Sequence, residues 1–282
     1  MIIPDHQIET PEVRSWKGLH LLHFQSSSCS QKVRVLLREK GLDWTSHPVN
    51  LAREEHVTPW FMGINPRGVV PVLVHDGVVH AESNDILEYL DALPSDQASF
   101  FPQDEEERRT VKQDLLLEDS LHMDLRNLTM GFIMPYRLAR KSKATLARWE
   151  NEGQTNPKRA IEVQWWRDYA SDGIPPATAQ RSVDAHRAVF LRLDERLEDS
   201  PWLIGDRLSV LDISWFITAT RLAHAGYPLE NHPHLADWRS RLAARPAFVE
   251  ETSDPRPMQV ALNAYQAFRR FTKTALRDVT DL

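Results

Sequence analysis

The chain has 282 residues, 41% of them hydrophobic and 26% charged, and its formal net charge is −6 at pH 7. This length favours two compact domains of a water-soluble protein, and an acidic chain without clusters of Lys and Arg is not expected to bind nucleic acid. Its single cysteine, Cys29, excludes an internal disulfide and a cysteine-based zinc site and suits a reducing compartment. With no membrane-length apolar run and a polar, acidic N-terminus, we expect a cytoplasmic protein without membrane contact.

Residues 1–17 contain two prolines and mixed charges without a periodic pattern. Such a segment predicts an extended arm that lies over the first domain or is partly disordered. We expect no functional residues in it.

A strand, a serine-rich turn and a helix follow the arm. The apolar run Leu19–Phe24 indicates a short buried strand, and the apolar residues of Val33–Leu37 alternate with charged ones as in a helix. Serines in the turn at 25–30 suit the N-cap of that helix, and Gly41 suits its end. A helix that starts directly after a strand presents free N–H groups, which can hold an anion such as a thiolate or a carboxylate.

A second strand and a hairpin are predicted next. Asp43–Leu51 indicates a strand, and Val69–Val74 is a β-branched run that contains Pro71. A proline in a strand is tolerated only at an edge, at a bulge or at the start of the strand, and a buried one raises the question of a cis peptide bond. The Asp76–Gly77 pair is typical of a tight hairpin turn.

The first domain closes with another helix. Glu82, Ser83 and Asn84 form a cap ahead of a helical pattern over Asp85–Leu93. The order strand, helix, strand, loop, hairpin, helix therefore predicts a compact α/β domain over residues 18–95.

From residue 101 to 282 the pattern is helical, which predicts an all-α second domain. Its amphipathic stretches are Glu105–Arg140, Val183–Glu198, Ser209–Ala225, Pro233–Ala243 and Val260–Asp278. The segment at about 139–181 is polar and contains three prolines, so we expect a long, partly ordered excursion between two helices.

Three residue groups together resemble the glutathione transferase superfamily. They are SSSCSQKVR at 26–34, INPRGVVPVL at 64–73 and AES at 81–83, and SVLDIS at 209–214 looks like the capping box of the family's core helix. The resemblance implies a thioredoxin-like α/β domain followed by an all-α domain. The branch related to ganglioside-induced differentiation-associated protein 1 resembles this chain in SQKVR, in TPWFMGINPRGVVPVLV at 58–74 and in the excursion. SSCS, followed by a basic residue and Val-Arg, is also similar to the zeta class. We do not expect the C-terminal hydrophobic membrane anchor of that branch in this chain.

The resemblance places thiol activation on the serine-rich turn. In serine-type members a hydroxyl donates a hydrogen bond to the glutathione sulfur and stabilises the thiolate, which is the nucleophile. Counting back from Gln31, this role falls on Ser27, with Ser26 and Ser28 expected to be caps. The alternative is that all the serines only cap the helix.

Cys29 is a rival nucleophile. Relatives that use a cysteine carry it at position 27, so Cys29 does not match and is expected to be a half-buried bystander. Because a cysteine in the first helical turn has a lowered pKa, a thiol reductase that uses Cys29 stays open as an alternative.

The resemblance also implies glutathione contacts. Pro71 matches the family's cis-proline, and Val70 before it matches the residue that pairs with the cysteinyl backbone. Ser83 with its helix N-terminus matches the group that takes the γ-glutamyl carboxylate, and Glu82 matches the one that takes the ammonium. A plain helix cap is the alternative for both. The candidates for the glycyl carboxylate are His56, Arg67 and Arg53.

The second substrate is expected against the first long helix of the helical domain. The candidates share helical spacing or aromatic character, and they are Met123, Arg126, Met130, Tyr136 and Trp165. A stripe of this kind is more often part of a core than of a pocket. His20 and His23 fall on opposite faces of the first strand, and we expect no metal site.

These inferences predict a cytoplasmic glutathione transferase with a role in detoxification. It is expected to be a homodimer in which Ser27 activates glutathione, the co-substrate, for attack on a small apolar or aromatic electrophile. Conjugation, ether cleavage, dehalogenation and isomerisation all begin with that thiolate. The alternative from another class is a glutathione-binding or protein-interaction module without catalysis.

Overall fold

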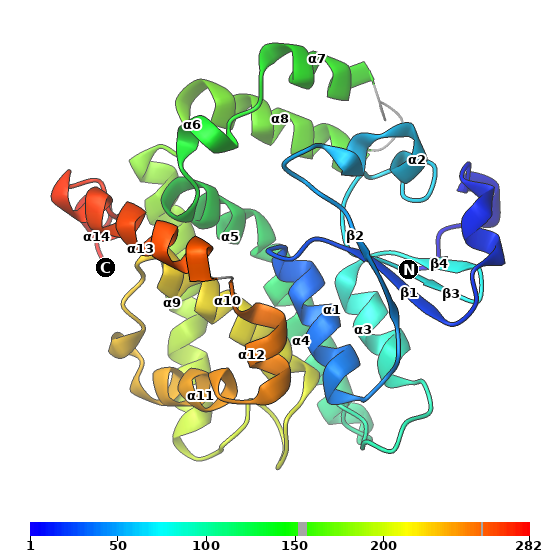
Figure 1. Cartoon of the computed structure of the whole chain (residues 1–282). Coiled ribbons are helices and arrows are strands. Elements are labelled where there is room, and N and C mark those ends of the chain that lie inside the picture. Colours follow the sequence, from blue (N-terminus) through cyan, green and yellow to red (C-terminus); the bar gives the residue numbers. More distant parts are fainter. Residues whose placement is uncertain (152–156, 255) are drawn as a thin grey trace. The chain divides into compact units, whose positions relative to one another are not determined.

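The computed structural model describes the chain except for residues 152–156 and 255. The contacts divide it into two compact units (Figure 1). One consists of residues 1–98 and 140–172, and the other of residues 99–139 and 173–282.

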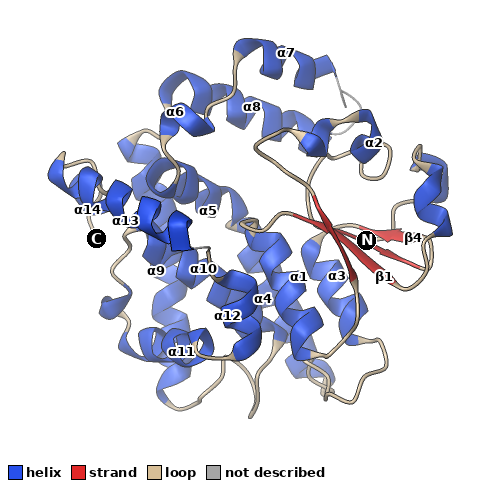
Figure 2. Cartoon of the chain, in the orientation of Figure 1, coloured by secondary structure: helices blue, strands red, loops and turns tan. Residues whose placement is uncertain are grey.

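The first unit is built on a four-stranded sheet in the order β2-β1-β3-β4. Figure 2 draws the strands in red. The strands are β1 (Leu19–His23), β2 (Thr45–Pro48), β3 (Val72–His75) and β4 (Val78–His80). β1 runs parallel to β2 and antiparallel to β3, and the β3–β4 pair is the predicted hairpin. Two helices, α1 (Ser28–Glu39) and α3 (Ser83–Asp91), pack against each other.

The N-terminal arm is part of the core of this unit. It contains two 3-10 helices, η1 (Asp5–Gln7) and η2 (Pro11–Ser15). The arm buries Ile3, Ile8 and Val13 in a cluster with the side chains of β3. Of the two expected states, the arm therefore lies over the first domain, because its apolar residues cover one face of the sheet.

The excursion groups with the first unit, whereas the sequence placed it in the helical domain. It forms α7 (Lys143–Asn151) and α8 (Pro157–Asp172), and residues 152–156 within it lie outside the described residues. Trp149 of α7 and Val163 of α8 share a buried cluster with Val57, which follows β2. This burial explains the grouping, because Val57 lies in the 3-10 helix η3 (Glu55–Val57), just ahead of α2 (Pro59–Met62).

The second unit is helical, which confirms the predicted fold class. Its helices are α4 (Glu105–Ser120), α5 (His122–Leu128), the π-helix η4 (Thr129–Ile133), α6 (Tyr136–Ala139), α9 (Pro176–Glu198), α10 (Val210–Ala225), the 3-10 helix η5 (Leu229–Asn231), α11 (Pro233–Ala243), α12 (Pro246–Thr252), α13 (Arg256–Phe271) and α14 (Leu276–Val279). Within the described part of the chain, no helix is long and apolar enough to cross a membrane.

One long helix over Glu105–Arg140 was the wrong expectation. The stretch breaks at Leu121, where ψ is 3°, passes through the π-helix and stops before Pro135. A proline lacks the N–H that continues a helix and restricts the residue before it, so the ladder ends there.

The predicted capping box of α10 is present. Asp212 accepts hydrogen bonds from the backbone N–H of Ser209 at 2.8 Å and of Leu203 at 3.0 Å, and from the indole of Trp238 at 2.8 Å. Burial raises the pKa of this carboxyl, and the hydrogen bonds from Ser209, Leu203 and Trp238 oppose the rise.

Candidate functional site

Ser27 is the N-cap of α1. Its Oγ accepts a hydrogen bond from the backbone N–H of Ser30 at 3.3 Å, and its backbone is extended, with φ −76° and ψ 122°. The side chain is half-buried. Both the capping role and the helix N-terminus that the sequence predicted are therefore present.

The side chain of Arg34 donates hydrogen bonds to the turn before Ser27. This guanidinium is only 1% exposed and donates to the carbonyl oxygens of Phe24 at 3.2 Å and Gln25 at 3.0 Å. A buried cation with a fixed fork of donors can hold two adjacent carbonyls in one geometry. Arg34 thus fixes the backbone that presents Ser27.

The Val70–Pro71 peptide bond is cis, and it lies next to this turn. β1 and β3 pair antiparallel with Leu22 opposite Val72. Continued by two residues, that register brings Val70 beside Phe24, where the turn opens. Val70 and Pro71 are both buried.

The hairpin brings Glu82 and Ser83 to the same edge of the sheet. β3 and β4 pair with Leu73 opposite His80, and the continued register puts Pro71 beside Glu82. Glu82 has φ 66°, a left-handed conformation that is uncommon for a residue with a side chain, and Ser83 opens α3. The sheet therefore gathers the Ser27 turn, the cis-proline and the start of α3 at one edge.

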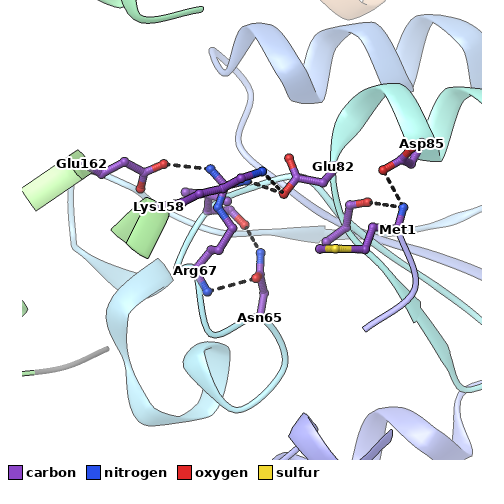
Figure 3. A network of polar contacts seen from close by, with 9 residues as sticks. Met1, Asn65, Arg67, Glu82, Asp85, Lys158 and Glu162 are labelled. Carbon is purple, nitrogen blue, oxygen red and sulfur yellow. Dashed lines mark hydrogen bonds and ion pairs between the residues drawn. The ribbon is translucent and has the colours of Figure 1, made fainter. Parts of the chain in front are cut away.

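Glu82 belongs to a network of alternating charges, drawn in Figure 3. Arg67 donates to Oε1 of Glu82 through Nη1, and to Oε1 of Glu162 at 3.1 Å through Nη2. Nζ of Lys158 lies 3.6 Å from the same Glu82 oxygen. Although burial by itself raises the pKa of Glu82, the charges of Arg67 and Lys158 lower it below the ordinary value. The Glu82 side chain is thus a carboxylate at neutral pH.

The loop before the cis-proline shapes this network. Asn65 Oδ1 accepts from the backbone N–H of Arg67 at 3.1 Å, and its Nδ2 donates to the carbonyl of Val69 at 2.9 Å. One buried side chain therefore closes the loop that carries both Arg67 and the cis bond.

His56 lies under the excursion. Its ring is 9% exposed and meets the ring of Trp149 edge to face, with 5.7 Å between centroids. Burial, followed by the charges of Arg159 and Lys141, lowers the pKa of His56 to about 3. At neutral pH this side chain is uncharged, so among the candidates for the glycyl carboxylate it can offer a hydrogen bond but no charge. Arg53 is exposed.

The candidates for the second substrate do not share one unit. Met123 and Arg126 lie on α5, Met130 in η4 and Tyr136 at the start of α6, all in the second unit, and all are partly exposed. Trp165 lies on α8 in the first unit, where its ring stacks on that of Tyr169 at 5.2 Å.

Sequence reasoning missed several residues at the first site. Arg34, Lys158 and Glu162 were not candidates, although Lys158 and Glu162 stand four apart and therefore share one face of α8. Arg34 stood within the quoted SSSCSQKVR group, but nothing local indicates that it reaches back across the turn. Among the described residues, no group of three or more His, Cys, Asp or Glu side chains is placed to hold a metal.

Comparison with known proteins agrees with this geometry. Residues 26–93 match the family model of the glutathione S-transferase N-terminal domain, and residues 170–246 match that of the C-terminal domain. Together these matches cover just over half of the chain, and neither covers residues 94–169.

Relatives match over different lengths. Protein LigF of Sphingobium sp. (strain NBRC 103272 / SYK-6) is 29% identical over 239 residues, which is 82% of this chain and 92% of that protein. Ganglioside-induced differentiation-associated protein 1-like 1 of Homo sapiens is 36% identical over 93 residues, 31% of this chain and 25% of that protein. A zeta-class glutathione S-transferase of Euphorbia esula is 48% identical over 73 residues, 26% of this chain and 32% of that protein. Both expected resemblances are confirmed.

Among solved structures, that of beta-etherase LigF from Sphingobium sp. strain SYK-6 matches with a TM-score of 0.73 and 28% identity, covering 83% of this chain and 98% of that one. The fold, the order of the motifs and both family models agree. The chain therefore belongs to the glutathione S-transferase family, whose enzymes use glutathione as a co-substrate.

Proposed function

We propose that the first unit binds glutathione and that Ser27 activates its thiol. The observation that carries this proposal is the gathering of three features at one sheet edge: the Ser27 turn, the cis bond before Pro71, and Glu82 with Ser83 at the start of α3. A thiolate next to the Ser27 hydroxyl would also lie near the N-terminus of α1, which favours negative charge. Val70 would pair with the cysteinyl backbone.

The reaction that we favour is thiolytic cleavage of an ether. The glutathione thiolate attacks the carbon that carries the ether oxygen, a C–S bond forms, the C–O bond breaks, and the leaving oxygen takes up a proton. The relative that supports this choice is a beta-etherase, and its match extends over 98% of that structure. The second substrate that we propose is a small aromatic ether.

Cys29 supports a weaker rival. It sits in the first turn of α1 and is half-buried. A thiol reductase would lose activity in Cys29→Ala and keep it in Ser27→Ala, whereas the proposed enzyme would do the reverse.

The decisive experiment measures glutathione binding by calorimetry together with the ultraviolet absorbance of the bound thiolate. Wild type is expected to bind with thiolate absorbance, Ser27→Ala to bind with little of it, and Cys29→Ala to match wild type. Thiolate absorbance that persists in Ser27→Ala would overturn the role of Ser27. If wild type does not bind glutathione at all, the enzyme function fails.

The same proposal includes a cytoplasmic homodimer that detoxifies electrophiles. Sedimentation equilibrium tests the assembly, and it should return twice the mass of one chain. A monomer at micromolar concentration would contradict this part and leave the site proposal standing.

A further inference from the structure

The excursion helix α8 reaches the proposed glutathione site with two charged side chains. Glu162 accepts from Arg67 at 3.1 Å, and Lys158 lies 3.6 Å from Glu82. Both residues fall in the part of the chain that neither family model covers. Lys158 and Glu162 therefore come from outside the two matched domains, whereas Arg67 lies within the first of them.

The network leaves half of the Glu82 carboxylate open. Arg67 and Lys158 both contact Oε1, and within the residues that the structure describes Oε2 accepts no hydrogen bond (Figure 3). Arg67 cannot turn fully onto Glu82, because its other nitrogen is held by Glu162, whose side chain is 10% exposed. Glu162 thus keeps one carboxylate oxygen of Glu82 available to a ligand.

Lys158 offers the opposite charge close by. Its side chain is 64% exposed, and its 3.6 Å separation from Glu82 is longer than a normal hydrogen bond. An open carboxylate oxygen beside an exposed ammonium matches an α-amino acid group, which carries an ammonium and a carboxylate on one carbon.

We propose that α8 completes the site for the γ-glutamyl end of glutathione, with Lys158 binding its carboxylate and Glu162 positioning Arg67 and Glu82 for its ammonium. The inference rests on the proposed function and deepens it. Lys158 touches the ligand, whereas Glu162 acts through Arg67. The rival explanation is that the network only tethers the excursion to the first unit.

Two analogues of glutathione separate these explanations. In 4-aminobutanoyl-cysteinyl-glycine the γ-glutamyl carboxylate is absent, and in glutaryl-cysteinyl-glycine the ammonium is absent. Calorimetry would give the affinities of all three peptides for wild type, Lys158→Met, Glu162→Gln and the control Lys143→Met, which removes an exposed lysine from α7 of the same excursion.

Lys158→Met is expected to weaken glutathione and the glutaryl peptide about fivefold to tenfold and to leave the 4-aminobutanoyl peptide unchanged. In Glu162→Gln, Arg67 can cover both oxygens of Glu82, so binding of glutathione and of the 4-aminobutanoyl peptide should weaken by about the same factor. The glutaryl peptide has no ammonium, so its binding should not change. Lys143→Met should bind all three peptides like wild type.

This inference would be overturned if Lys158→Met and Glu162→Gln each lost the same affinity for all three peptides, or lost none. A network that only tethers the excursion would not affect the three peptides differently. In that case wild-type binding of glutathione would still stand. A wild type that binds none of the peptides would instead overturn the proposed function, and this inference with it.

Discussion

Lys32 on α1 donates a hydrogen bond from Nζ to Oδ1 of Asn84 on α3, at 3.1 Å. Lys32 is 2% exposed and Asn84 is partly exposed, so this bond is made in a partly buried setting. It joins the helix capped by Ser27 to the helix that begins at Ser83. The two ends of the proposed glutathione site are therefore linked through one side-chain pair.

Breaking this link should loosen the site. Asn84→Leu leaves the Lys32 ammonium without this acceptor, so we expect the free energy of unfolding to fall by about 1–3 kcal/mol and glutathione to bind more weakly. Asn84→Asp keeps an acceptor for Lys32 and should retain affinity close to wild type. Urea unfolding and calorimetry on the two variants test this, and equal affinity in both would contradict the role of the link.

The pKa of His56 predicts an acid-sensitive fold. The folded state lowers this pKa from 6.5 to about 3, so between these values the unfolded state binds more protons. The contribution of neutral His56 to the free energy of unfolding is then fully present above about pH 7. It decreases as the pH falls, by about 2 kcal/mol at pH 5. His56→Gln should remove this part of the dependence of the free energy of unfolding on pH. Urea unfolding of wild type and variant at pH 5 and pH 8 gives the comparison, and an unchanged difference between the two pH values would refute it.

Asp212 should be the more costly of two capping acids. It is fully buried and accepts from Leu203, Ser209 and Trp238, so Asp212→Ala should lower the free energy of unfolding by about 3 kcal/mol or more. The control is Asp278→Ala, which removes an exposed acid whose one acceptor contact among the described residues is with the backbone N–H of Ala275 at 2.9 Å. That variant should lose about 1 kcal/mol. Similar losses in the two variants would show that burial does not set the cost.

Gly77 should tolerate a side chain poorly because the N-terminal arm covers it. Its φ is +84°, and an added Cβ would lie 2.4 Å from the carbonyl oxygen of Arg14. Gly41 has φ +63°, and no described atom would lie within 4 Å of a Cβ added there. Gly41→Ala should therefore lower the free energy of unfolding by only about 1 kcal/mol, through its backbone conformation. Gly77→Ala should cost clearly more and expose the arm to protease. Thermal unfolding and limited proteolysis of the two variants measure the difference, and equal melting temperatures would contradict the contact.

Much of the fold could be predicted because it is encoded locally. The Ser27 cap, the Asp76–Gly77 hairpin turn and the Asp212 capping box each depend on residues a few positions apart, and all three are present. The proline in the strand pattern left several explanations open, and the resemblance to glutathione transferases implied the cis bond that is present before Pro71. Such signals act within one turn or one strand, so the sequence carries them directly.

The candidate site was predicted only in part. Glu82 and Arg67 were expected as independent ligands of glutathione, at the ammonium and the glycyl end, but the structure pairs them with each other. His56 was expected to be a cation or donor, and its burial leaves it neutral at pH 7. Burial and pairing are properties of the packed chain, and neither has a local signature.

The sequence alone determined the family, the α/β and all-α halves and the Ser27 turn, since motif order, helix caps and hydrophobic period are written along the chain. Only the tertiary structure decided that the excursion packs on the first unit and that Lys158 and Glu162 meet Glu82 and Arg67. In sequence, Lys158 lies 76 residues from Glu82, and Glu162 lies 95 residues from Arg67. Contacts at such separation arise from the burial of Trp149 and Val163 against Val57, and no periodicity along the chain records them.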